Sequence, residues 1–158
     1  MKLAKSSRLV FSLIAVLLSA GCGMGTKLQP PAASIQQLQV LPNGQWQLTL
    51  RIQNYSYDTG MHVYALDADF ILAGKRAGHV AVSPALDIPA MSADIANATI
   101  APNSEARTAL THAKGNAVAY ELKGSLSIGK GENGKSQPFD LDGKGYLSPV
   151  PGVANTWR

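Results

Sequence analysis

The sequence predicts a mostly β protein, a β-sandwich of about seven strands with one short helix. Apolar and polar residues alternate along several short segments, which is the period of a half-buried strand. Turn-forming residues separate these segments at short intervals. The strand segments follow one another without intervening helices, which favours packed antiparallel sheets over a doubly wound parallel sheet.

The clearest strand runs over residues 46–53. Trp46, Leu48, Leu50 and Ile52 fall on one face, and polar residues fall between them. The segment before it, residues 35–41, is connected through Pro42-Asn43-Gly44. An Asn-Gly pair between apolar segments favours a tight hairpin, because both residues tolerate positive φ. We therefore expect these two strands to pair.

The later strands are expected at residues 62–72, 77–82, 86–89, 93–100, 118–128 and 139–141. In the first of these, the alternation places one set of side chains on a common face: His62, Tyr64, Leu66, Ala68, Phe70 and Leu72. Asp67 and Asp69 then face solvent. Residues 86–89 end in Pro89, which cannot donate to a ladder, so we expect a short edge strand there. The Pro-containing tail, residues 148–158, has no regular pattern.

One helix is predicted between residues 104 and 114. Asn103 or Ser104 can cap its start, and Glu105 lies in the first turn. A stripe of alanines and Leu110 forms its apolar face. Gly115 follows as a terminator.

Residues 1–21 have the form of a bacterial lipoprotein signal peptide. A basic start leads into a short apolar stretch that ends in Ser19-Ala20-Gly21-Cys22. The apolar stretch is shorter than the roughly 20 residues a membrane-spanning helix needs. Cys22 is the only cysteine of the chain. We therefore expect Cys22 to be the acylated first residue of the mature protein, and neither a disulfide partner nor a nucleophile.

Acylation of Cys22 would fix the location of the protein. Each buried methylene contributes about 0.8 kcal/mol, so several acyl chains hold a protein firmly on a membrane. The residue after the cysteine is Gly23 and not an aspartate, which resembles the default signal for export to the outer membrane. We therefore expect an outer-membrane lipoprotein facing the periplasm. Residues 22–33 are expected to be a tether, and residues 34–147 the folded domain.

Charge gives no reason to expect nucleic acid as a partner. Of the 14 basic residues, three lie in the signal, which leaves 11 against 10 acidic residues from Cys22 onward, a net charge near +1. Nucleic-acid binding needs a clustered basic face.

The motifs that could carry chemistry are weak. Residues 129–136 match the phosphate-loop pattern, but that motif must open a helix, and Pro138 and strand residues follow here. A hairpin loop is expected instead, with no nucleotide. Asp67 and Asp69 could approach a cation from one strand face. Two carboxylates on a strand face are, however, usually solvent-exposed polar residues without a metal. We expect no metal, no cofactor and no catalytic residues.

Three segments resemble the late embryogenesis abundant type 2 family, also called the water stress and hypersensitive response (WHy) domain. Residues 46–54 resemble the family strand that ends in an Asn-Pro-Asn-like turn, although Tyr55 stands where the family usually has proline. Residues 86–90 resemble its apolar-Pro element, and residues 120–124 resemble its Tyr-x-Leu-x-Gly strand. The resemblance covers about residues 33–147.

The resemblance implies an immunoglobulin/fibronectin type III-like sandwich without an enzymatic site, associated with tolerance of desiccation and other stress. It also implies a role for Asn54 as a structural turn residue. The expected function is a membrane-anchored protective protein. Two alternatives stay open at this point: a binding or assembly module of an envelope protein complex, and, less favoured, an enzyme.

Overall fold

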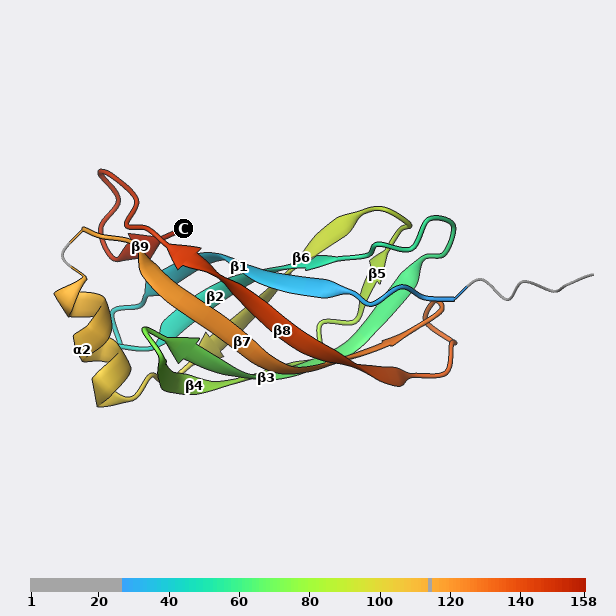
Figure 1. The fold of residues 1–158 in the computed structure, drawn as a ribbon, viewed down its shortest axis with the longest axis horizontal. Coiled ribbons are helices and arrows are strands. Elements are labelled where there is room, and N and C mark those ends of the chain that lie inside the picture. Colours follow the sequence, from blue (N-terminus) through green and yellow to red (C-terminus); the bar gives the residue numbers. More distant parts are fainter. Residues whose placement is uncertain (1–26, 114) are drawn as a thin grey trace, which may run out of the picture.

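The computed structural model describes residues 27–113 and 115–158, and these residues form a two-sheet β-sandwich (Figure 1). The strands within this part of the chain are β1 (Ala32–Val40), β2 (Trp46–Gln53), β3 (Met61–Leu72), β4 (Lys75–Val82), β5 (Leu86–Ile88), β6 (Ala93–Ile100), β7 (Val118–Gly129), β8 (Gln137–Leu147) and β9 (Thr156–Trp157). The predicted mostly β sandwich is confirmed.

The two sheets contain different parts of the chain. One has the order β6-β2-β1-β9, and the other has the order β4-β3-β7-β8, with β5 pairing onto β3. All the pairings are antiparallel. The hairpin predicted at Asn43-Gly44 joins β1 to β2, with Val40 opposite Trp46. No helix among the described residues is long and apolar enough to cross a bilayer.

The core lies between the two sheets and contains the residues that the alternation predicts. In β2, Trp46, Leu48, Leu50 and Ile52 are all buried. The ring of Trp46 meets that of Phe70 from the opposite sheet edge-on, with centroids 6.3 Å apart. Burial of such side chains is the main term holding the sheets together, because each contributes about 1.5–3 kcal/mol.

β3 differs from the predicted pattern at its start. A register shift against β7 between Val63 and Ala65 breaks the strict alternation. Met61 and Val63 are buried in the core, and Leu66 continues the inward set beyond the shift. The expectation that His62 and Tyr64 share the face of Leu66 is therefore wrong. A β-bulge inserts one extra residue and so exchanges the faces on its two sides.

The predicted helix is present as α2 (Ser104–His112) and covers one end of the sandwich (Figure 1). Asn103 is its N-cap, and the Asn103 side chain accepts a hydrogen bond from the N–H of Ala106 at 2.8 Å. Ala106 and Leu110 are its buried residues. The same end carries the β1–β2 and β3–β4 turns and the C-terminal residues. We call it the helix end.

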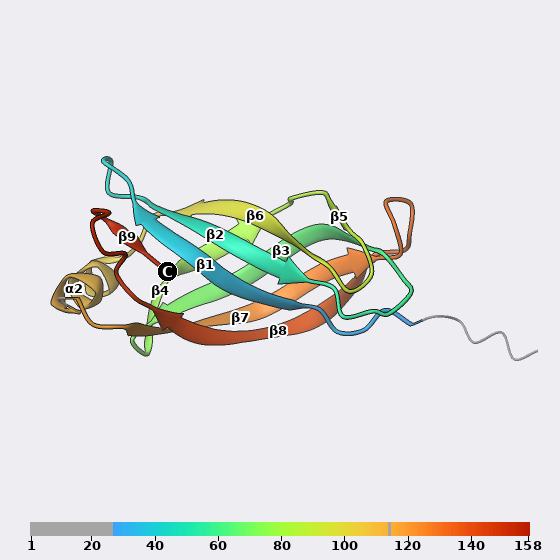
Figure 2. The same ribbon diagram turned by 90° about the horizontal axis from the view of Figure 1, so that it is seen from above.

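The opposite end, which we call the loop end, carries the β2–β3, β5–β6 and β7–β8 connections and the start of β1 (Figures 1 and 2). The folded domain includes residues before Ser34, since Leu28 is buried and β1 begins at Ala32. The tail also contributes to the fold, because β9 pairs with β1 and Trp157 lies opposite Leu38.

Candidate functional site

Cys22, the predicted acylation site, lies outside the described residues. The nearest described feature is the start of the domain. Leu28 is buried, and the N–H of Gln29 donates to the hydroxyl of Ser56 at 2.9 Å. The chain that follows the cysteine therefore joins the domain at the loop end.

Asn54 is fully buried at the end of β2. Its side-chain amide donates to the carbonyl oxygens of Thr59 at 2.9 Å, Ile88 at 3.1 Å and Pro89 at 3.1 Å. Its side-chain oxygen accepts from the N–H of Ser56 at 2.9 Å. Asn54 thus closes the β2–β3 loop and fastens it to the segment after β5. Two of the three family-like segments meet through this one side chain.

The third family-like segment is in β7, where Tyr120 and Leu122 are buried. The Tyr120 hydroxyl accepts a hydrogen bond from the N–H of Ile35 at 3.0 Å. Gly124 lies against β3 so closely that a Cβ there would clash with the carbonyl oxygen of Asp67 and lie 2.5 Å from the Cα of Ala68. The tyrosine, the leucine and the glycine of the Tyr-x-Leu-x-Gly pattern therefore each have a packing role in this domain.

Asp67 and Asp69 lie on the outer face of the five-stranded sheet, as predicted, and their partner on β4 is His79. The His79 ring nitrogens lie 3.4 Å from Asp67 Oδ2 and 3.1 Å from Asp69 Oδ1. Arg76 lies 2.7 Å from the same oxygen of Asp69. The hydrogen bond that Asp69 accepts from the His79 ring raises the pKa of His79, and the hydrogen bond that Asp69 accepts from Arg76 lowers the pKa of Asp69. The partners of both carboxylates are therefore side chains of the protein itself.

Further ion pairs cover the rest of this face. Lys123 lies 2.6 Å from Glu121, and Lys144 lies 3.3 Å from Asp142. No group of three metal-ligating side chains with metal-site geometry occurs within residues 27–113 and 115–158. We call this outer surface of β3, β4, β7 and β8 the charged face.

His62 is buried against Asp87 on β5, with 2.8 Å between His62 Nδ1 and Asp87 Oδ1. The ring of Tyr64 lies beside it, with centroids 4.6 Å apart. The Tyr64 hydroxyl points into the β7–β8 loop, where the carbonyl oxygens of Gly131 and Glu132 lie 3.3 Å and 2.9 Å away. Asp87 is not predictable as the partner of His62 from sequence, because the pairing of β5 with β3 brings them together.

The β7–β8 loop is the segment that matches the phosphate-loop pattern. It joins two antiparallel strands, so the predicted hairpin loop is confirmed. Its carbonyl oxygens converge on Tyr64, whereas a phosphate cradle presents N–H groups to its ligand. The loop is thus organised around a hydroxyl donor of the domain itself.

The outer face of the four-stranded sheet has a different chemistry. Its β1, β2 and β6 positions form cross-strand rows of uncharged amides and hydroxyls: Gln39, Gln47 and Thr99 in one row, and Gln37, Thr49 and Asn97 in the next. The Thr49 hydroxyl donates to the Asn97 side-chain oxygen at 3.2 Å. We call these six residues the amide face. The two outer faces of the sandwich therefore differ: one is covered by ion pairs, and the other has these two uncharged rows at its centre. Arg51 lies in the next row of the same face, and Arg158 donates to the Gln37 side-chain oxygen at 3.1 Å.

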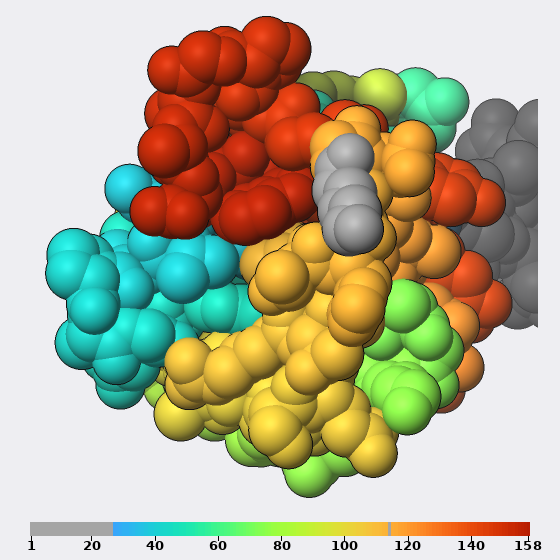
Figure 3. Space-filling view, turned by 90° about the vertical axis from the view of Figure 1, so that its left-hand side faces the viewer, coloured from blue at the N-terminus to red at the C-terminus, as the bar shows by residue number. Residues whose placement is uncertain are grey.

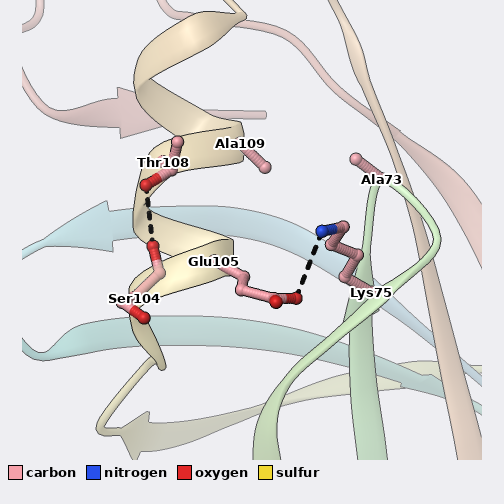
Figure 4. Close-up of a pocket in the computed structure, with 6 residues that line it drawn as sticks. All are labelled: Ala73, Lys75, Ser104, Glu105, Thr108 and Ala109. Atoms are coloured by element: carbon pink, nitrogen blue, oxygen red, sulfur yellow. Dashed lines mark hydrogen bonds and ion pairs between the residues drawn. The ribbon is translucent and has the colours of Figure 1, made fainter.

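Two shallow hollows flank α2 at the helix end. The first has a volume of about 320 Å³ and lies between α2 and the β3–β4 turn (Figure 4). Lys75 and Glu105 face each other across it, 3.3 Å apart. The second, about 260 Å³, lies between α2, the end of β1 and the C-terminal residues. Figure 3 looks onto this end, with α2 in gold between the β1–β2 turn in cyan and the β3–β4 turn in green.

The comparisons with known proteins identify the fold. No family model and no curated protein sequence matches the chain. The structure is similar to the solution structure of AT1g01470 from Arabidopsis thaliana, with a TM-score of 0.53 and 16% identity over 82% of this chain and 88% of that one. The two proteins share a fold. A crystal structure of a protein from Archaeoglobus fulgidus is also similar, with a TM-score of 0.44 and 12% identity over 78% of this chain and 98% of that one.

Proposed function

We propose that this chain is an envelope lipoprotein of the late embryogenesis abundant type 2 (WHy) kind, anchored through acylated Cys22, and that its domain protects neighbouring surfaces during water loss without catalysing a reaction. The three family-like segments support the family, because each has a definite packing role in one sandwich. The fold shared with the plant protein AT1g01470 is consistent with it. The signal-like residues 1–21 support the anchor and an outer-membrane location facing the periplasm.

The amide face is the observation that carries the protective function. Neutral amides and hydroxyls can replace water as hydrogen-bond partners of a protein or lipid headgroup. They also desolvate at a much lower cost than charged groups, which matters when water is withdrawn. Gln39, Asn97 and Thr99 are exposed on this face, so their polar groups are available for such contacts.

A non-enzymatic role is supported by where the titratable groups lie. Asp67, Asp69 and His79 form a cluster of such groups, and they lie on an open sheet face. The hollow beside α2 is spanned by an ordinary exposed ion pair, Lys75 with Glu105.

Survival after drying tests the proposal. A deletion strain is complemented with the wild-type gene, with Cys22→Ser, or with the double variant Gln39→Glu and Asn97→Glu. We expect Cys22→Ser to leave the membrane fraction, and we expect the double variant to stay on the membrane but to lose protection. The matched control is Ala117→Glu with Ala119→Glu, which adds the same charge at exposed positions away from the amide face. Equal survival of the deletion and wild-type strains would refute the protective function.

A binding or assembly role is the second candidate, because β8 is an 11-residue strand at the end of its sheet and could accept a strand from a partner. Cross-linking in intact cells separates the two roles. A stoichiometric partner captured through β8 would favour assembly, and diffuse contacts through the amide face would favour protection.

A further inference from the structure

Exposed apolar side chains gather at the loop end of the sandwich. Among the described residues, Tyr57 is 85% exposed, Met91 53% and Tyr55 46%, and all three lie in the β2–β3 or β5–β6 connections. Ile95 is exposed near the start of β6, on the same side. Tyr146 and Val153 are also exposed, but they lie toward the helix end. The loop end is therefore the more apolar of the two ends.

Hydrogen bonds hold these loops beside the point where the chain enters the domain. Ser56 lies between Tyr55 and Tyr57, and its hydroxyl accepts from the N–H of Gln29 at 2.9 Å. Its carbonyl oxygen accepts from the N–H of Met91 at 3.0 Å. The exposed side chains and the entering chain thus belong to one hydrogen-bonded unit (Figures 1 and 2).

The backbone conformation at Met91 is unusual for a residue with a long side chain. Met91 has a φ of 54°, in the left-handed region that favours glycine and asparagine. The other non-glycine residues with positive φ in the described parts of the chain are Ala73, Ala85 and Asn155. Met91 is thus the one long apolar side chain held in this strained conformation. Such outliers concentrate where a side chain serves a function.

The distance from Cys22 limits how far the loop end can lie from the lipid. Six peptide units separate Cys22 from buried Leu28, and an extended chain covers at most ~3.3–3.6 Å per residue, so the reach is about 20 Å. The headgroup layer of each leaflet is itself roughly 6 Å thick. By contrast, the 12 residues of β7 extend over about 40 Å toward the helix end. An acyl anchor therefore brings the loop end to the membrane first.

We propose that the loop end docks on the anchoring membrane, with Tyr57 and Met91 inserted into the headgroup layer and α2 pointing away. This inference rests on the proposed function, because it needs an acylated Cys22. Tyrosine suits this layer, since its ring is apolar and its hydroxyl is polar. Basic residues are not in excess at this end, with Lys27, Lys130 and Lys135 against Asp58, Asp87, Asp94 and Glu132. Apolar insertion, rather than attraction to anionic lipid, therefore drives the contact.

Fluorescence quenching on the full acylated protein tests the orientation. Cys22 is the only native cysteine and is blocked by acylation, so a single introduced cysteine can be labelled selectively. The variants are Tyr57→Cys and Met91→Cys at the loop end, with Tyr146→Cys and Val153→Cys as matched exposed controls. Each labelled protein is reconstituted into vesicles of phosphatidylethanolamine with and without phosphatidylglycerol. Quenching is measured with a nitroxide lipid and with aqueous iodide, after circular dichroism confirms that each variant is folded.

We expect the labels at positions 57 and 91 to be quenched several-fold more by the nitroxide lipid than the labels at 146 and 153, with or without phosphatidylglycerol. Equal iodide quenching at all four positions would overturn the proposal, as would a pattern that requires anionic lipid. If the labels at positions 57 and 91 are protected from both quenchers, a protein covers this surface, and that result would also overturn the proposal. If the wild-type protein does not partition into detergent, acylation itself fails, and that result refutes the anchor in the proposed function instead.

Discussion

The hydroxyl of Tyr120 in β7 crosses between the sheets and accepts a hydrogen bond from the N–H of Ile35 in β1 at 3.0 Å. A register shift between Ile35 and Gln37 breaks the β1–β2 ladder at this point. Gly145 makes room for the ring, because a Cβ there would lie 2.8 Å from it. The family-like Tyr120 thus satisfies a buried backbone donor beside a β-bulge, and burial raises the pKa of its phenol.

Replacing Tyr120 with phenylalanine should destabilise the domain. The ring would still pack, but the N–H of Ile35 would be left without a partner, at a cost of about 1–3 kcal/mol in the free energy of unfolding. Urea denaturation should show a lower midpoint with an unchanged slope. Tyr146→Phe is the matched control, because Tyr146 is 73% exposed. Equal midpoints for the two variants would contradict the role given to the Tyr120 hydroxyl.

Asn54→Asp should be strongly destabilising although it preserves shape. The carboxylate would face the carbonyl oxygens of Thr59, Ile88 and Pro89, which now accept from the amide. We expect a loss of about 2–5 kcal/mol, the range for breaking a buried hydrogen-bonded group and burying a charge. The exposed Asn97→Asp serves as the control in thermal denaturation. If Asn54→Asp and the control have similar melting temperatures, the hydrogen bonds of the Asn54 amide do not contribute to the stability of the domain.

Gly124→Ala should separate β7 from β3 locally. The new methyl group would clash with the backbone at Asp67, which cannot move away as a flexible side chain could. Overpacking of this kind costs about 1–3 kcal/mol or more. Gly60→Ala is the control, because a Cβ there would meet the carbonyl oxygen of Ile88 at an ordinary 3.7 Å. Chemical denaturation measures the difference in the free energy of unfolding between the two variants. Similar values would be inconsistent with the close approach of Gly124 to the backbone at Asp67.

The pKa of His79 should lie above the ordinary histidine value of 6.5, mainly because the His79 ring is hydrogen-bonded to the Asp69 carboxylate. The charged imidazolium therefore contributes to stability below pH 6.5, and this contribution is lost as the pH rises through the raised pKa. NMR titration of the histidine ring protons measures the pKa of His79 directly. Asp69→Asn should move the pKa of His79 back toward its ordinary value, whereas Asp142→Asn should not. An unchanged titration in Asp69→Asn would exclude Asp69 as the cause.

Local patterns predicted the strands and the helix because they depend on residues close in the sequence. The alternation at Trp46–Ile52 and the cap at Asn103 are such cases, and both are present in the structure. The alternation failed at His62 and Tyr64, because a bulge depends on how β3 aligns with β7. Strand β9 was not expected, since two residues carry no period and become a strand only by pairing with β1.

The sequence by itself determined the sandwich class, the charge balance from Cys22 onward and the expectation of acylation at Cys22, because composition, period and the signal-like start are properties of neighbouring residues. Only the tertiary structure decided which distant groups meet. It brought Asp87 to His62, the Tyr120 hydroxyl to Ile35, and Tyr57 and Met91 to the point where the chain enters the domain. Such contacts depend on strand register and loop closure, and a one-residue shift in register would exchange the faces and remove them.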